Sequence, residues 1–182
     1  GLRDFSDIES RLQPEEAMKL MSRYLGLCET AVKRNGGEID KFIGDTAMAV
    51  FKEAPGAGSS RLRAARAALD LETEMAAWMK ERIQAGQEPI RHGVGFACGS
   101  PVAGHIGSLR KRLDATVIGD TVNLAARLEK LAGRDANPSL LTTAETIAEL
   151  GDGITRVPTS IHGVRGRQEA IEVVGIRRPD NG

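Results

Sequence analysis

The chain has 182 residues, the length of one domain that can bury a hydrophobic core. Its 25 Lys and Arg residues balance its 25 Asp and Glu residues, so the formal net charge is zero, which argues against a nucleic-acid-binding protein. Its longest apolar runs are much shorter than the ~20 residues needed to cross a bilayer, so we expect no membrane contact by this domain.

The first half of the chain is expected to form two helices with two strands between them. In order, these elements are expected at residues 14–35, 38–43, 46–51 and 61–84. Apolar residues recur at helical spacing in the first and last of these segments. Gly44 and Asp45 join the two strands and suit a tight hairpin.

The second half is expected to contain further strands and helices. They are a strand pair at 91–99 and 102–104, a short strand at 117–118, a helix at 121–131, a strand at 139–141, a helix that ends at 150 and a hairpin at 154–176. A capping box of Thr142 and Glu145 opens the last helix, and the hairpin turns at 166–168. The order helix, strand, strand, helix, strand is four-fifths of a β-α-β-β-α-β unit that lacks its opening strand. We therefore predict one α/β domain over residues 1–182, built as an α+β sandwich.

Two cysteines lie far apart in the sequence. Cys28 falls on the apolar face of the first helix and Cys98 within an expected strand. Their spacing matches no zinc site, so both are interpreted as buried, reduced thiols. Reduced cysteines fit a cytoplasmic domain, including the cytoplasmic part of a larger membrane-bound or sensor-linked protein.

The segment 39–45 places polar residues around the tight turn. Lys41 precedes Asp45 by four residues, so an extended strand would give the two side chains one face. A carboxylate at a hairpin tip points out of the sheet and can ligate Mg²⁺. The alternative is that Gly44 and Asp45 form a good turn and nothing more.

The segment 116–127 combines a threonine with two polar residues on one helix face. Thr116 precedes a short apolar run, and Asn123 and Arg127 are separated by one helical turn. The alternative is a surface ion pair for the arginine and a simple first-turn role for the asparagine.

Taken together and in this order, the two segments resemble the signature segments of the class III nucleotidyl cyclases. The resemblance runs from residue 2 to about residue 176 and implies a ferredoxin-like core with an extra C-terminal helix and hairpin, its first strand cut at the N-terminus. It implies an adenylate cyclase, which converts ATP into 3′,5′-cyclic AMP and pyrophosphate. Two ions per site, Mg²⁺ or Mn²⁺, and a head-to-tail homodimer with composite sites are also implied.

The resemblance assigns purine and ribose contacts to four residues. Lys41 would donate to an acceptor nitrogen of adenine, and Thr116 would face the exocyclic amine. Guanylyl cyclases of the family usually carry Glu with Cys or Ser at these positions, so this pair points to ATP. Asn123 would orient the ribose, and Arg127 would stabilise charge on the α-phosphate.

Further basic residues and backbone groups are implied for the phosphates. Arg165 takes the place of a lysine that holds the triphosphate in the family, and the backbone amides of Phe5 and Ser6 would cradle the phosphates. A basic cluster just before the second segment offers another phosphate contact, with the choice open among Arg110, Lys111 and Arg112. The alternative is a solvated loop cluster with no ligand.

The metal ligands are the point where the chain departs from the family pattern. Asp45 would bind metal, and the backbone carbonyl of Leu2 would help. The first metal aspartate would fall at position 1, which is Gly1, and Asp4 replaces the usual glycine of the following turn. We expect that an aspartate and a strand precede Leu2 in a longer parent protein.

Two other functions stay open. A guanylyl cyclase is opposed by Lys41. A catalytically impaired cyclase-homology module, acting in dimerisation or nucleotide sensing, is favoured by Gly1 and disfavoured by the remaining site residues.

Overall fold

The computed structural model describes residues 1–100, 102–106, 114–148, 150, 154–161, 164–165 and 170–179, with the backbone alone described at 102–106, 114–117 and 164–165. The helices are α1 (Phe5–Glu9), α2 (Pro14–Arg34), α3 (Ser60–Gln84), α4 (Asp120–Leu131) and α5 (Ala144–Ile147). The strands are β1 (Glu38–Ile43), β2 (Thr46–Val50), β3 (Val94–Gly95), β4 (Val102–Ile106), β5 (Asp114–Ile118), β6 (Leu140–Thr143), β7 (Thr155–Val157), β8 (Val164–Arg165), β9 (Ala170–Ile171) and β10 (Val173–Arg177).

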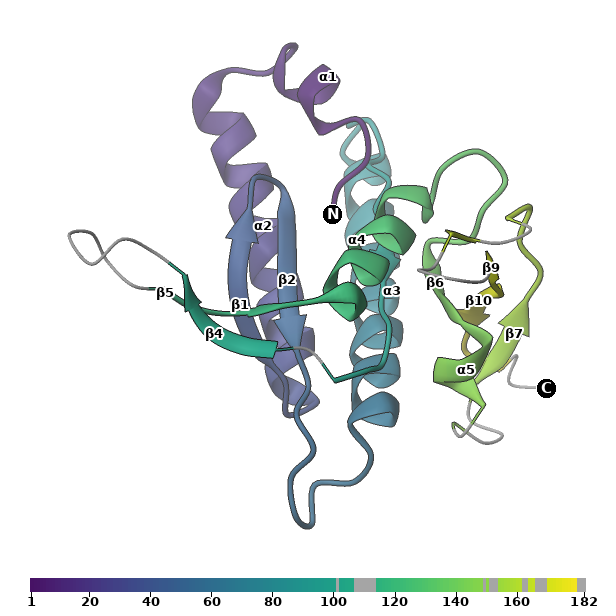
Figure 1. The fold of residues 1–182 in the computed structure, drawn as a ribbon. Helices are drawn as coiled ribbons and strands as arrows, with labels where there is room; N and C mark the ends of the chain where they lie inside the picture. Colours follow the sequence, from purple (N-terminus) through teal and green to yellow (C-terminus); the bar gives the residue numbers. More distant parts are fainter. Residues whose placement is uncertain are drawn as a thin grey trace.

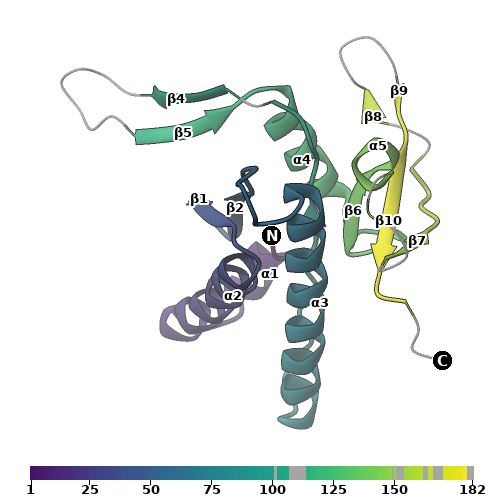
Figure 2. The ribbon, with the colours of Figure 1, turned by 90° about the horizontal axis from the view of Figure 1, so that it is seen from below.

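The helix and hairpin expected near the amino end are confirmed. α2 begins at Pro14, where a helix needs no N–H donor, and the Glu16 carboxylate accepts the Gln13 N–H at 3.3 Å. β1 and β2 pair antiparallel, and Gly44 turns between them with a φ of 58°, which favours glycine. The hairpin packs on α2 (Figures 1 and 2).

A four-stranded sheet lies on the other side of α3 from the hairpin (Figures 1 and 2). Its strand order is β3-β6-β10-β7. β3 runs parallel to β6, whereas β10 runs antiparallel to both of its neighbours. The β1–β2 hairpin and the four-stranded sheet are therefore separate sheets on the two sides of α3.

The expected pairing of residues 91–99 with 102–104 is wrong. β4 pairs with β5 instead, and the two form an arm that projects from the rest of the molecule (Figures 1 and 2). Segment 91–99 pairs with β6 through the short strand β3. Side-chain alternation identifies a strand but not its partner, which explains this error.

The C-terminal elements are shifted slightly from those expected. Thr143 caps α5 in place of Thr142, because its hydroxyl accepts the Thr146 N–H at 3.1 Å. The helix ends at Ile147 and is shorter than expected. β8 and β9 form the expected hairpin, whose turn at 166–168 lies outside the described residues.

In the part of the chain that the structure describes, the hydrophobic core consists of three clusters around α3 and α4. One lies between α2 and α3, a second between α3 and the four-stranded sheet, and a third beneath α4. Their most buried members include Tyr24, Met75, Leu128, Leu140 and Leu141. No helix in the described part of the chain is long and apolar enough to cross a membrane.

Candidate active site

The β1–β2 hairpin carries two of the expected site residues, Lys41 within β1 and Asp45 at the tip. Lys41 lies on β1, and its Nζ is 3.4 Å from Oδ2 of Asp40, a side chain that is only 11% exposed. Asp45 follows Gly44 in the turn, beyond the end of β1. The expected shared strand face therefore does not extend to Asp45, although both residues lie on one hairpin.

Position 1 lies beside this tip. Gly1 and Gly93 exchange backbone hydrogen bonds at 2.9 Å in both directions. A Cβ built on Gly1 would lie 2.6 Å from Oγ1 of Thr46, the residue after Asp45, and 2.5 Å from Oε1 of Glu129. Figure 1 shows the amino terminus close to the hairpin tip. Position 1, expected to carry the first metal carboxylate, is therefore a glycine that lies beside the residue following Asp45.

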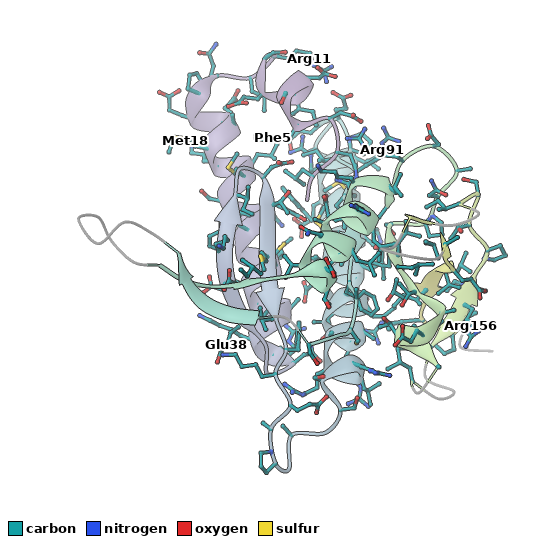
Figure 3. The ribbon with its side chains drawn as sticks, in the orientation of Figure 1. Phe5, Arg11, Met18, Glu38, Arg91 and Arg156 are labelled. Atoms are coloured by element: carbon teal, nitrogen blue, oxygen red, sulfur yellow. The ribbon has the colours of Figure 1, made fainter. Side chains whose placement is uncertain are left out.

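The segment after Gly1 folds into the unexpected helix α1. Leu2 is buried and forms a β-bridge with His92. Asp4 precedes the helix with a φ of 56°, in the left-handed region that glycine adopts most easily. This conformation explains why the family pattern usually has a glycine where this chain has Asp4. The N–H groups of Phe5 and Ser6 are the first two of α1, which have no helical acceptor of their own. Figure 3 shows Phe5 and Arg91 in this region, where Arg91 Nη2 donates to Asp4 at 2.8 Å.

A buried arginine that the sequence analysis did not identify fixes this segment. Arg3 is 4% exposed and donates to the Ala132 carbonyl and to Glu129 Oε1, both at 2.7 Å. It also donates to the Glu129 carbonyl and, at 3.1 Å, to the Leu2 carbonyl. Arg3 therefore ties the amino terminus to the end of α4. The sequence shows no sign of this burial, because an arginine in an expected phosphate-binding loop is ordinarily taken to be exposed.

Helix α4 presents Asn123 and Arg127 on its exposed face. The Asn123 N–H donates to the Gly119 carbonyl at 3.1 Å, which sets the start of the helix. The opposite face, with Val122 and Ala125, lines a groove of about 670 Å³ between β2 and residues 93–100. Within one chain, Asn123 and Arg127 therefore face away from the groove, which Gly1 also lines.

The remaining expected site residues lie on the two other hairpins. Thr116 is on β5 opposite Gly104, and Arg165 is on β8 opposite Ala170. Arg110, Lys111 and Arg112 lie outside the described residues.

The residues present do not form a two-metal site by themselves. Among the described residues, no group of three or more His, Cys, Asp or Glu side chains could hold a metal ion. The Leu2 carbonyl, expected to help bind metal, already accepts the Arg3 guanidinium. Asp45 is thus the single carboxylate of the expected pair, because position 1 is glycine.

Burial shifts the pKa values of the groups next to the groove. It lowers the pKa of the Gly1 amino group, although Glu129 Oε1 lies 3.4 Å away and favours the charged form. Burial also raises the pKa of the Tyr24 hydroxyl and of the Cys28 thiol. Both cysteines are free, and Cys98 is half-buried instead of buried as expected.

Residues 1–174 match the model of the adenylate and guanylate cyclase catalytic domain. The chain belongs to this family. It is 32% identical over 182 residues to adenylate cyclase 1 of Rhizobium meliloti (strain 1021), covering 98% of the chain and 27% of the relative. It is 29% identical over 184 residues to an adenylate cyclase of Anabaena cylindrica, covering 97% of the chain and 35% of the relative. The chain thus spans about a quarter to a third of the length of these curated relatives.

Solved cyclase structures share this fold. The adenylyl cyclase CyaB from P. aeruginosa superposes with a TM-score of 0.83 at 25% identity, covering 99% of this chain and 91% of that one. A bacterial light-regulated adenylyl cyclase gives 0.78 at 31% identity, with 96% and 85% covered. The guanylyl cyclase Cya2 gives 0.78 at 25% identity, with 99% and 90% covered. These likenesses confirm the expected family and α+β fold class.

Proposed function

We propose that this cyclase domain acts on ATP and forms 3′,5′-cyclic AMP and pyrophosphate. The observation that carries the proposal is the presence of both Lys41, on β1, and Thr116, on β5, one in each of the two signature segments. A lysine offers donors only and suits the acceptor N1 of adenine, whereas N1 of guanine is itself a donor. The named adenylate cyclases among the relatives support the same choice.

In the proposed reaction, the ribose 3′-oxygen attacks the α-phosphorus and pyrophosphate leaves. Asn123 orients the ribose, and the guanidinium of Arg127 stabilises the charge that develops on the α-phosphate. Arg165 and the first N–H groups of α1 hold the triphosphate. The Mg²⁺ or Mn²⁺ ions of the family would need a second carboxylate beside Asp45, which the glycine at position 1 does not supply.

We infer that the working unit is a homodimer with composite sites. Asn123 and Arg127 are exposed on α4, on the face away from the groove, so a second chain is the natural source of the opposing half. Large apolar side chains are exposed next to the site residues: Phe42 is 48% exposed, Ile43 58% and Ile118 46%. Such apolar groups beside a polar site favour a protein interface.

The glycine at position 1 favours a second candidate, a module that binds nucleotide with little turnover. It leaves a triphosphate and its metal ions with one carboxylate fewer than the family pattern supplies. We expect the chain to bind ATP weakly through Lys41, Thr116 and Arg165. Binding of ATP without cyclic AMP formation, in a chain that carries Asp at position 1, would favour this module over the enzyme.

The test of the proposed substrate measures cyclic AMP from ATP and cyclic GMP from GTP, with Mn²⁺ present, in the Gly1→Asp background. We expect preference for ATP, and a Lys41→Glu/Thr116→Cys variant is expected to shift the ratio of products toward cyclic GMP. Lys19→Glu, an exposed lysine on α2, is the control for the change in charge and leaves the ratio unchanged. A preference for GTP in the unmodified pair contradicts the proposal.

A further inference from the structure

Strand β1 has an irregularity next to Lys41, the residue proposed to contact the purine. Near the base of the hairpin, Ile39 lies opposite Ala49 on β2. The next pair along the ladder joins Lys41 to Met48. Ala49 and Met48 are consecutive in the sequence, whereas Asp40 intervenes on the other strand. Asp40 is thus an extra residue on β1, which is the arrangement of a β-bulge.

The bulge determines which face of the hairpin carries Lys41. In an unbroken strand, residues two apart share a face, so Lys41 would lie on the face of Ile39. Directly opposed residues also share a face, which places Ile39 with Ala49 and with Ala47, two residues along β2. Ala47 packs against the core cluster between α2 and α3, so this face is covered by helices. Lys41 is opposed by Met48 and therefore lies on the other face.

The face that carries Lys41 is the one on the side of the β4–β5 arm. Helix α2 and the arm lie on opposite sides of the hairpin (Figures 1 and 2). The arm includes Thr116 on β5, the other residue proposed to contact the purine. The extra residue in β1 therefore turns Lys41 toward the element with which it would share the base.

The bulge also allows Asp40 to contact its neighbour. Oδ2 of Asp40 lies 3.4 Å from Nζ of Lys41. Adjacent side chains of a regular strand point to opposite faces, so this contact depends on the bulge. The Asp40 side chain is 11% exposed and that of Lys41 39%, so the carboxylate is enclosed by the protein while the ammonium reaches solvent. An enclosed carboxylate limits the flexible lysine to the directions that keep this contact.

We propose that Asp40 is a positioning residue for Lys41. As the extra residue of the bulge, it turns the lysine away from the helix-covered face, and its carboxylate holds the ammonium where it donates to N1 of the base. Asp40 acts through the lysine and does not itself contact the nucleotide. The inference rests on the proposed function, since it takes Lys41 as the group that contacts adenine.

The experiment measures how well the full chain distinguishes ATP from 1-deaza-ATP, which has a C–H group in place of N1. Both dissociation constants are measured by isothermal titration calorimetry, because damage to the fold would weaken both nucleotides alike. We expect Asp40→Asn, which keeps the size and removes the charge, to reduce the preference for ATP by about 3-fold. Glu38→Gln is the matched control. Glu38, labelled in Figure 3, is an exposed acid of the same strand that pairs with Lys52 at 2.8 Å, so its loss should leave the preference unchanged.

A second comparison tests whether Asp40 acts through Lys41. Lys41→Ala alone should remove the preference for ATP, because the donor to N1 is lost. Asp40→Asn added to Lys41→Ala should then change the preference no further, since the two residues act as one unit. If Asp40→Asn does not fold, Asp40→Ser replaces it in both comparisons.

Three results would overturn the proposal, and they separate it from the proposed function. An unchanged preference in Asp40→Asn, with the preference lost in Lys41→Ala, removes the positioning role and leaves the role of Lys41 intact. A further change when Asp40→Asn is added to Lys41→Ala shows that Asp40 acts by another route. An unchanged preference in Lys41→Ala, or no binding of ATP, contradicts the proposed function itself, and the positioning role is then contradicted with it.

Discussion

Position 1 is the residue at which a single side chain most changes the chemistry of this site. A Cβ on Gly1 would lie 2.6 Å from Oγ1 of Thr46, the residue after Asp45, and 2.5 Å from Oε1 of Glu129, so the ends of these two side chains must move to admit it. Gly1→Asp should then add a carboxylate near Asp45, and carboxylates are the donor type that Mn²⁺ and Mg²⁺ prefer. We expect Mn²⁺ to bind at least about 10-fold more tightly to this variant than to the unmodified chain, by isothermal titration calorimetry.

The contribution of Asp45 to metal binding is tested in the Gly1→Asp variant. Asp45→Ala added to Gly1→Asp should return the Mn²⁺ affinity to that of the unmodified chain or below it. Asp7→Ala, which removes an exposed carboxylate from α1, is the matched control and should leave the affinity of Gly1→Asp unchanged. Equal affinity in the presence and absence of Asp45 would show that the ion binds elsewhere.

For single residues, the sequence predicted the structure where a residue type favours a particular local backbone conformation. Gly44 and Asp45 in a tight turn could be predicted, because a turn depends on neighbouring residues alone. The burial of Arg3 could not, since its partners Glu129 and Ala132 are distant in sequence and come close only after α4 has packed. The proximity of position 1 to Thr46 likewise depends on tertiary packing.

At the scale of elements, a cluster of polar side chains links α3 to the four-stranded sheet. Glu72 Oε2 on α3 lies 3.0 Å from Nε2 of the buried His92, and the Ser139 hydroxyl lies 2.8 Å from both carboxylate oxygens of Glu72. Burial alone would raise the pKa of Glu72, but the hydrogen bonds from His92 and Ser139 outweigh it and lower the pKa. A carboxylate with a lowered pKa stabilises the fold above its unfolded-state pKa, and this stabilisation is lost as the pH falls through the folded-state pKa.

Glu72→Gln should therefore reduce stability and reduce the sensitivity to acid. We expect a loss of about 1 kcal/mol in the free energy of unfolding at about pH 5, measured with urea. The difference should shrink as the pH falls through the folded-state pKa of Glu72, because the carboxylate then becomes protonated in both states. Glu74→Gln is the control on the same helix, because Glu74 is 3.5 Å from Arg34 at the surface. A difference that does not shrink at acid pH would mean that the Glu72 charge is not what stabilises the link.

The sequence predicted helices better than strand partners. The bounds of α2, α3 and α4 agree with those expected to within a residue, because apolar periodicity and capping are local signals. The pairing of β4 with β5 was missed, since it depends on which edges are already occupied. Helix α1 was also missed, because its five residues are too few to show a period.

At the scale of the whole molecule, the expected site residues of one chain are divided between two separate surfaces. Lys41 and Asp45 lie on the hairpin, whereas Asn123 and Arg127 lie on the exposed face of α4. This division suits a two-fold dimer in which each site takes one half from each chain. The exposed apolar side chains around the hairpin supply a surface on which two copies could pair.

Mixing two inactive variants tests that arrangement. In the Gly1→Asp background, Lys41→Ala and Arg127→Ala should each abolish cyclic AMP formation alone, because every site in either homodimer lacks one group. Random pairing makes half of the dimers mixed, and each mixed dimer has one intact site of two, so activity should return to about a quarter of the unmutated level. A mixture of Lys41→Ala with Asp45→Ala is the control: both changes fall in the same half, so no site is rebuilt and activity stays absent. If the first mixture restores nothing although mixed dimers form, Lys41 and Arg127 do not belong to complementary halves of one site.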